Sequence, residues 1–258
     1  MLPIHRVKKT VFNYDEIPAG YYHRAMLEGK PVQRFWHREK FRELARRIGP
    51  EDRVLDVGCG PGSFLHILAE EKPGIQGLGV DIASRQIDYA REFFGRSLPS
   101  SRIEFRTLDA TGFELPFESG TFDVVTSVEV IEHIHPFLAA QCLREARRVL
   151  KPDGRLLVTT PNYRSFWPLI EWLMERMSPV KYHEQHISQF TPNAFVKFLE
   201  LCGFEITDLR TIFVAAPFLA GLGQGFARRV LAVEQAMPLV RSAGSLLVAE
   251  ARVWAGGS

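Results

Sequence analysis

Two acidic residues and a histidine lie close together in the middle of the chain, in the segment Glu129-Val130-Ile131-Glu132-His133. If the chain becomes helical at Glu129, then Glu132 and His133 follow three and four residues later and share one face of the helix. Two carboxylates and an imidazole on one face suit a divalent cation. The same residues also fit a metal-free reaction in which His133 is a general base, or a purely structural role. The spacing alone leaves these three interpretations open.

A second pattern is a glycine turn, which follows the apolar run at 54–57 and reads Asp56-Val57-Gly58-Cys59-Gly60-Pro61-Gly62. Glycines at alternate positions let the backbone bend tightly and approach a ligand closely. Further along, Asp81 ends the next apolar run, where a carboxylate can accept hydrogen bonds from both hydroxyls of a ribose. The glycine spacing differs from the Gly-x-Gly-x-x-Gly of dinucleotide-binding proteins, which disfavours an oxidoreductase.

The glycine turn resembles that of the class I S-adenosylmethionine-dependent methyltransferases. Later segments follow in the same order as in that family, including Asp81-Ile82, Asp109-Ala110 and Leu150-Lys151-Pro152-Asp153-Gly154. The resemblance implies that S-adenosylmethionine is the cofactor and S-adenosylhomocysteine the product. The residues that it assigns to cofactor binding are Asp56, Gly58, Cys59, Gly60, Gly62, Asp81, Ile82, Asp109, Ala110 and Val128.

The Glu-x-x-Glu-His segment resembles two groups within that family. One is the ubiquinone-pathway O-methyltransferases, and the other methylates the 3′-terminal ribose of small RNAs with the help of a metal ion. In the second group a later histidine is the fourth metal ligand, and the matching position here is His186. This resemblance implies a metal set of Glu129, Glu132, His133 and His186, with Mg²⁺, Mn²⁺, Fe²⁺ or Zn²⁺ as the ion. Glu132 and His133 are also the candidate catalytic residues.

The elements that must position these residues follow from short apolar runs that alternate with helical segments. The runs lie at 54–57, 77–82, 103–108, 122–128 and 155–160, with further strands expected at about 204–213 and 246–253. Helices are expected at about 63–71, 84–94, 136–150 and 192–202. Apolar runs that alternate with helices predict βαβ units in a parallel sheet covered on both faces. We therefore expect an α/β fold with a Rossmann-like, doubly wound, seven-stranded and mostly parallel sheet.

The chain divides into an expected N-terminal helical cap at 1–50 and a methyltransferase domain at 51–258. Two inserts, at about 163–190 and 214–245, interrupt the alternation of strands and helices. The first contains a candidate amphipathic helix, 165–177, with two tryptophans and two methionines. We expect the inserts to form a lid over an apolar acceptor, with packing against the sheet or peripheral contact with a membrane as alternatives for the helix.

Composition limits the function classes further. The chain has 258 residues and a formal net charge of +2, which gives no electrostatic argument for a nucleic-acid partner. The three cysteines form no Cys-x-x-Cys pair, and the N-terminal segment lacks the apolar stretch of a signal peptide. These observations predict a cytoplasmic protein with a small-molecule partner. They say nothing about its oligomeric state.

The sequence thus predicts a methyltransferase that methylates an oxygen atom of a small, apolar or aromatic acceptor. Two alternatives stay open. The first is N- or C-methylation of a small molecule, and the second is a non-catalytic relative that binds the cofactor. The sequence does not identify the acceptor, because function resides in the site and not in the fold.

Overall fold

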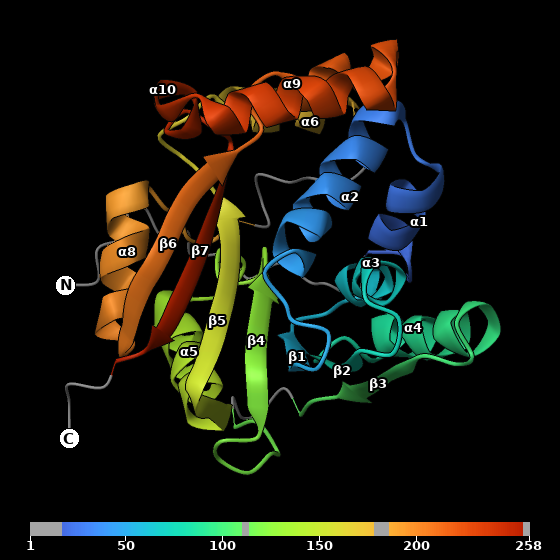
Figure 1. Cartoon of the computed structure of the whole chain (residues 1–258), viewed down its shortest axis with the longest axis vertical. Coiled ribbons are helices and arrows are strands. Elements are labelled where there is room, and N and C mark those ends of the chain that lie inside the picture. The colour runs from blue at the N-terminus through green and yellow to red at the C-terminus, as the bar shows by residue number, and fades with distance from the viewer. Residues whose placement is uncertain (1–16, 110–113, 178–185, 255–258) are drawn as a thin grey trace.

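The computed structural model describes residues 17–109, 114–177 and 186–254, and its centre is one seven-stranded sheet (Figure 1). The strands are β1 (Arg53–Val57), β2 (Gln76–Asp81), β3 (Arg102–Thr107), β4 (Phe122–Val128), β5 (Leu150–Pro161), β6 (Phe204–Ile212) and β7 (Leu246–Val253). Their order in the sheet is β3-β2-β1-β4-β5-β7-β6, and β7 runs antiparallel to both of its neighbours. The predicted fold class, a doubly wound and mostly parallel sheet, is confirmed.

Helices cover both faces of the sheet because its central strands are apolar on both sides. They are α1 (Tyr21–Glu28), α2 (Pro31–Ala45), α3 (Ser63–Glu71), α4 (Ser84–Ser97), α5 (Pro136–Val149) and α8 (Pro192–Leu201). One core joins Phe35 of α2, Phe64 of α3 and Ile87 of α4. The other joins Leu143 of α5 and Phe195 of α8. The two cores hold the sheet between them.

Two boundaries differ from the sequence pattern. The helix expected to end at Gly95 continues to Ser97, because Leu98 N–H still donates to the carbonyl of Phe94 at 2.9 Å. The strand expected at 155–160 begins earlier, because Leu150 already pairs with Phe122 of β4, with a register shift before Val124. Neither difference moves the carboxyl ends of the strands.

The two inserts contain α6 (Trp167–Met177), the 3-10 helix η2 (Ala216–Leu222), α9 (Gln224–Ala236) and α10 (Pro238–Arg241). Figure 1 shows α6 and α9 lying across the end of the molecule at which β4 and β5 finish. The ring of Trp167 lies 5.6 Å from that of Trp36 in α2, between centroids, so the first insert packs on the N-terminal helices. That the inserts form a lid stays a prediction.

Within the described residues, no helix is both long and apolar enough to cross a membrane.

Helix α1 is fastened to the rest of the fold by a buried pair of histidines. His23 Nε2 lies 2.7 Å from Nδ1 of His66 in α3, and His23 Nδ1 lies 3.1 Å from the hydroxyl of Tyr89 in α4. Burial, then the positive charge of His66 and that of Arg24, lower the pKa of His23 to about 3. The His23 ring is therefore neutral while α1 packs as it does.

Acidification should weaken this packing. The pKa of His23 in the folded state lies below its unfolded value of about 6.5, so protonation favours unfolding. The contribution of neutral His23 to the free energy of unfolding is complete above its unfolded pKa. It is lost as the pH falls toward the pKa of His23 in the folded protein. The melting temperature should therefore fall as the pH is lowered from about 6.5 toward about 3, and fall less in His23→Gln. Equal pH dependence in the two proteins would contradict this account.

Candidate functional site

The order of the strands reverses between β1 and β4, and ligands of open α/β sheets bind at such a switch point. The glycine turn follows β1 at this place. The N–H groups of Gly58 and Cys59 donate to the carbonyl of Val80 in β2, at 2.8 and 3.1 Å. Gly58 has a φ of 75°, and a Cβ there would lie 2.5 Å from Cγ2 of Val130. Glycine is thus required where the turn meets the segment after β4.

Asp81, at the end of β2, fixes the outer part of the turn. Its Oδ2 accepts from the N–H of Gly60 at 2.7 Å, and its Oδ1 accepts from the N–H of Ala83 at 2.8 Å. Burial raises the pKa of Asp81. The neighbouring Ile82 is exposed, which leaves an apolar side chain beside the carboxylate. Asp109 follows β3 and is exposed, whereas the expected site residue Ala110 lies outside the described residues.

Asp56 and Cys59 are buried beneath the glycine turn, in the interior of the fold. The carboxylate of Asp56 is buried and its Oδ1 accepts a hydrogen bond of 2.6 Å from the hydroxyl of Thr126 in β4. Burial raises the pKa of Asp56 to about 7. The thiol of Cys59 is also buried, and a Cβ at Gly79 would lie 2.8 Å from its sulfur. Both residues therefore shape the turn from within the fold.

Gly62 and Val128 complete the set of expected cofactor residues. Gly62 has a φ of 76°, and a Cβ there would lie 2.8 Å from the ring of Phe105. Val128 ends β4 and is half-buried against the core that contains α2 and α3. The structure thus brings the described members of the set to the carboxyl ends of β1, β2, β3 and β4.

The Glu-x-x-Glu-His segment is a turn, so the expectation of a helix beginning at Glu129 is wrong. The N–H of Glu129 donates to the carbonyl of Thr159 at 3.1 Å, which continues the pairing of β4 with β5. Glu129 has a left-handed φ of 54°. The N–H of His133 then donates to the carbonyl of Val130, and α5 begins only at Pro136.

The turn nevertheless gathers three of the four expected ligands. Glu132, His133 and His186 each offer a ligand atom, and these atoms lie within 4.8 Å of one another. The backbone fixes this approach, because the N–H groups of Ile187 and Ser188 both donate to the carbonyl of Glu132, at 2.7 and 2.9 Å. We call Glu132, His133 and His186 the Glu-His-His cluster.

The carboxylate of Glu132 is fully buried, and neither of its oxygens has a hydrogen-bond partner among the described residues. Burial, and next the negative charge of Glu129, raise its pKa well above the ordinary value, although the Glu132 backbone, the Thr160 hydroxyl and the charge of Lys40 act in the opposite direction. A buried carboxylate without donors is costly unless it is protonated or faces a cation. The carboxylate of Glu132 can therefore be neutralised either by a proton or by a bound cation.

Glu129, the fourth expected ligand, does not lie in the cluster, and its role as a ligand stays a prediction. Its carboxylate forms an ion pair with the ammonium of Lys40 in α2. The Lys40 side chain is 3% exposed, and that of Glu129 is 21% exposed. The local sequence around Glu129 carries no sign of Lys40, which lies 89 residues earlier in the chain.

Two further residues that sequence reasoning missed, Glu171 and Tyr163, support His186. Nδ1 of His186 lies 2.6 Å from Oε1 of Glu171 and 2.8 Å from the hydroxyl of Tyr163. Burial and the charge of Glu171 raise the pKa of Tyr163. The signal for Glu171 was present, since it is an acid within the otherwise apolar segment Trp167–Leu173. A carboxylate that binds one ring nitrogen of a histidine fixes the orientation of the ring, so that the other ring nitrogen can bind a metal ion.

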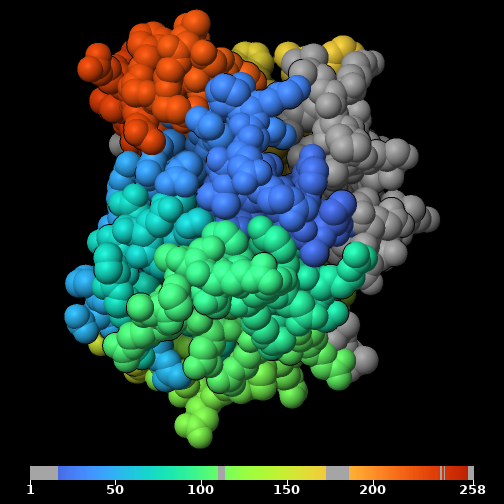
Figure 2. All heavy atoms as spheres, turned by 90° about the vertical axis from the view of Figure 1, so that its right-hand side faces the viewer, coloured from blue at the N-terminus to red at the C-terminus, as the bar shows by residue number. Residues whose placement is uncertain are grey.

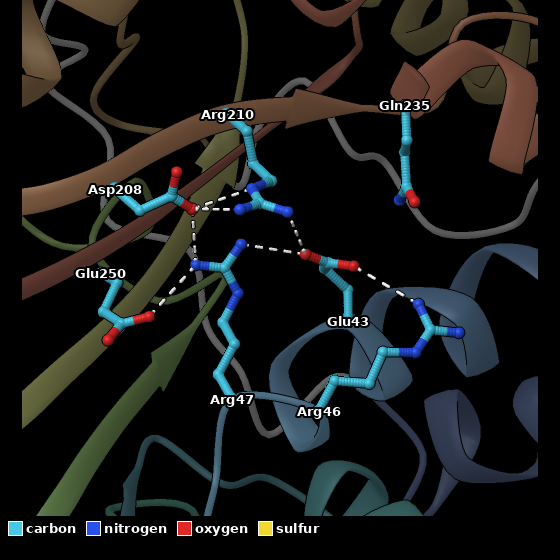
Figure 3. A pocket seen from close by; sticks show the side chains of 7 residues that line it. All are labelled: Glu43, Arg46, Arg47, Asp208, Arg210, Gln235 and Glu250. Carbon is cyan, nitrogen blue, oxygen red and sulfur yellow. Dashed lines mark hydrogen bonds and ion pairs between the residues drawn. The ribbon is translucent and has the colours of Figure 1, made fainter.

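A cavity of about 470 Å³ lies elsewhere, between α2 and the strands β6 and β7 (Figure 3). Its walls are Glu43, Arg46, Arg47, Asp208, Arg210, Gln235 and Glu250. Arg47 pairs with Glu43 at 2.9 Å and with Asp208 at 2.8 Å, and Arg210 also pairs with Asp208 at 2.8 Å. None of its residues belongs to the glycine turn or to the Glu-His-His cluster. This ion-pair network joins the C-terminal end of α2 to the sheet.

Comparisons with known proteins agree in identifying methyltransferases as relatives of this chain. A family model described as a methyltransferase domain matches residues 30–209. A probable S-adenosylmethionine-dependent methyltransferase of Mycolicibacterium smegmatis is 30% identical, and the alignment covers 74% of this chain and 67% of the relative. A ubiquinone/menaquinone biosynthesis C-methyltransferase of Geotalea uraniireducens is 27% identical over 78% of this chain and 93% of its own length.

The fold has close structural neighbours. An S-adenosylmethionine-dependent methyltransferase of Thermotoga maritima, described as a possible histamine N-methyltransferase, has a TM-score of 0.61 at 20% identity, covering 90% of this chain and 93% of its own. The chain spans 32% and 41% of the length of two other curated relatives. The names of these proteins include C- and N-methylation, so similarity does not decide the acceptor atom.

Substitution of the glycines tests the geometry of the turn. Gly58→Ala should destabilise the protein by about 2–4 kcal/mol, because it adds a collision with Val130 to the cost of a left-handed alanine. Gly60→Ala is the matched control: its φ is also positive, at 51°, but a Cβ there meets nothing within 4 Å. It should cost only about 1–2 kcal/mol. Urea unfolding measures both, and equal losses would show that Val130 does not constrain the turn.

Proposed function

Because the chain belongs to the class I S-adenosylmethionine-dependent methyltransferases, we propose that it transfers the methyl group of S-adenosylmethionine to an oxygen atom of a small acceptor. The observation that carries the proposal is the Glu-His-His cluster, which follows β4 at the switch point of the sheet. An acid–base cluster beside the cofactor turn is what activation of a hydroxyl group requires.

The cofactor would lie across the carboxyl ends of β1, β2 and β3. Asp81 would accept the ribose hydroxyls, since each carboxylate oxygen can accept a second hydrogen bond beside the one from the backbone. Ile82 would pack on the adenine ring, and Asp109 would bind its amine. Gly58 and Gly60 would let the cofactor approach the backbone.

The methionine end of the cofactor carries one ammonium and one carboxylate, and the Lys40–Glu129 pair offers the complementary charges. Glu129 would bind the ammonium and Lys40 the carboxylate. Glu129 follows β4 directly, and Val130 contacts the glycine turn, so the pair stands beside the turn that would hold the cofactor. Two charge-assisted hydrogen bonds in a partly buried site would contribute strongly to affinity.

In the proposed step, a lone pair on the acceptor oxygen forms a bond to the methyl carbon while the carbon–sulfur bond breaks. The bonding electrons remain on sulfur, and S-adenosylhomocysteine leaves. The hydroxyl proton passes to the cluster, with His133 as the acceptor in the absence of a metal ion. The remainder of the site supplies proximity and in-line orientation.

The cluster also fits a divalent cation. Glu132 contributes two buried oxygens that lack other partners among the described residues, and His186 has Nδ1 held by Glu171 so that Nε2 is left for an ion. A carboxylate and two imidazoles suit Mn²⁺, Fe²⁺ or Zn²⁺, and Mg²⁺ less well. Such an ion would lower the pKa of the acceptor hydroxyl.

The proposed acceptor is apolar or aromatic. The support is the aromatic surroundings of the cluster, where Trp167 lies 6.0 Å from the ring of His186 and 5.6 Å from that of Trp36, between centroids. Aromatic side chains of this kind bind flat, apolar groups. A nucleic-acid substrate has no support in the charge balance of the chain.

Methyl transfer from labelled cofactor to a panel of phenols and other small aromatic alcohols tests the proposal. The product should be an O-methyl ether. His133→Ala should lower the rate by about 10²–10⁴-fold with S-adenosylhomocysteine binding intact, whereas the exposed neighbour in His135→Ala should leave the rate unchanged. Chelation should abolish activity, and added Mn²⁺ should restore it.

Two outcomes would contradict parts of this proposal. A product methylated on carbon or nitrogen would reject the acceptor atom. Activity that survives exhaustive chelation but not His133→Ala would remove the cation and leave His133 as a metal-free general base.

The Lys40–Glu129 pair can be tested with two ligands that differ only at the methionine end. Lys40→Met should weaken S-adenosylhomocysteine binding by roughly tenfold or more and leave 5′-methylthioadenosine, which lacks the amino-acid part, unaffected. Arg38→Met is the control, since Arg38 lies on the same helix and pairs with Glu70 at the surface. Isothermal titration calorimetry measures all three proteins, and equal weakening of both ligands in Lys40→Met would contradict the assignment.

A further inference from the structure

The two inserts, one between β5 and β6 and the other between β6 and β7, carry most of the large apolar side chains that are exposed among the described residues. Among the described residues, eight of the twelve large apolar side chains that are exposed belong to α6 with its preceding residue, η2 and α9 with its C-cap. They are Phe166, Leu169, Trp172, Phe218, Leu222, Phe226, Val233 and Met237. Exposed apolar side chains that gather on neighbouring elements mark an interaction surface.

Helix α9 shows the feature most clearly, because large apolar side chains lie on its outward side as well as on its buried side. Ala227, Leu231 and Glu234 form its buried side, at helical spacing. On the outward side, Phe226 and Val233 lie seven residues apart and are 49% and 58% exposed. A surface helix normally turns polar residues to the solvent. The outward face of α9 therefore needs a partner.

The 3-10 helix η2 extends this face toward the N-terminal side of α9. Leu222 is 76% exposed, and Phe218 and Phe226 stand four residues to either side of it. The insert is held in place by Glu234, whose carboxylate accepts from the N–H groups of Ala215 and Ala216 at 2.7 and 2.9 Å. The apolar face thus belongs to an ordered unit, and we call it the η2–α9 face.

The charges on this insert have one sign at the surface. Glu234 is buried and its carboxylate is occupied by backbone donors, so it adds no exposed negative charge. Arg229 is exposed between Phe226 and Val233 on the outward side, and Arg228 is exposed beside it while pairing with Glu39 of α2. Within the described residues of η2 and α9, the exposed ionisable groups are therefore cationic.

The η2–α9 face lies at the same end of the molecule as the proposed reaction. Figure 1 places α6 and α9 together beyond the carboxyl ends of β4 and β5, and Figure 2 shows the atoms around α9 projecting past α1 and α2. The side-chain amide of Gln224, the first residue of α9, donates a hydrogen bond of 3.1 Å to the carbonyl of Pro31, the first residue of α2. This bond joins α9 to α2. In α6 and the residue before it, Phe166, Leu169 and Trp172 are exposed while Trp167 packs beside His186.

We propose that the η2–α9 face, with the exposed side chains of α6, docks on a membrane surface that contains anionic lipids. Aromatic and aliphatic side chains would enter the boundary between headgroups and acyl chains, and Arg229 would reach the lipid phosphates. A second copy of the chain fits less well, because a symmetric pair would bring arginines of like charge together. Resting on the proposed methyl transfer, this placement makes a membrane-borne apolar alcohol the natural acceptor class.

Co-sedimentation with vesicles tests the proposal with the full chain. The protein should bind vesicles of phosphatidylcholine mixed with phosphatidylglycerol and bind pure phosphatidylcholine more weakly. Leu222→Asp combined with Phe226→Ser should reduce partitioning by roughly tenfold or more, and Arg229→Glu should reduce it for the mixed vesicles only. Leu201→Asp is the matched control, since Leu201 is exposed to a similar degree on α8. It should bind like the unmodified protein.

Each outcome decides one question. Failure of the unmodified protein to bind mixed vesicles, or undiminished binding by the double variant, would overturn the proposal. Concentration-dependent dimerisation that the double variant abolishes, seen by light scattering, would assign the face to a second copy instead. Stabilisation against heat by S-adenosylhomocysteine, measured in every variant, reports correct folding. Its absence in the unmodified protein would reject the proposed function separately from the membrane surface.

Discussion

A carboxylate that is buried without a hydrogen-bond donor has to be neutralised, and Glu132 imposes this requirement on the whole site. Neither of its oxygens has a partner among the described residues, although its backbone carbonyl accepts two hydrogen bonds from the segment that carries His186. Backbone hydrogen bonds thus bring two imidazoles close to this carboxylate, while the carboxylate oxygens themselves have no hydrogen-bond partner among the described residues. Such a group is unfavourable for stability alone, which makes a bound cation or an exchanging proton the reason for its presence.

Helix α2 separates the roles of the two glutamates. Lys40 forms an ion pair with Glu129, whereas no cation among the described residues is paired with Glu132. Two acids three residues apart therefore meet opposite environments, as acid and base assignments in one site require. Lys40 belongs to α2, and just beyond the C-terminal end of that helix Arg47 pairs with Glu43 and Asp208.

The sequence predicted the parts of this arrangement that depend on local patterns. Apolar runs located every strand, and the glycine spacing located the turn, since both follow from short-range geometry. The set of Glu132, His133 and His186 followed from a resemblance, while the assumed helix at Glu129 was wrong because sheet pairing with Thr159 continues into that residue. Lys40 could not be foreseen, because its partner lies 89 residues away and only the folded chain joins them.

We propose that the Glu-His-His cluster holds a divalent cation beside the bound cofactor. A crystal structure with S-adenosylhomocysteine and Mn²⁺, measured at a wavelength that gives anomalous scattering from manganese, tests it directly. We expect one anomalous peak at about 2.0–2.3 Å from a Glu132 oxygen and from a nitrogen of His133 and of His186. Bound S-adenosylhomocysteine with no anomalous peak at these residues, or with His186 turned away from Glu132, would contradict it.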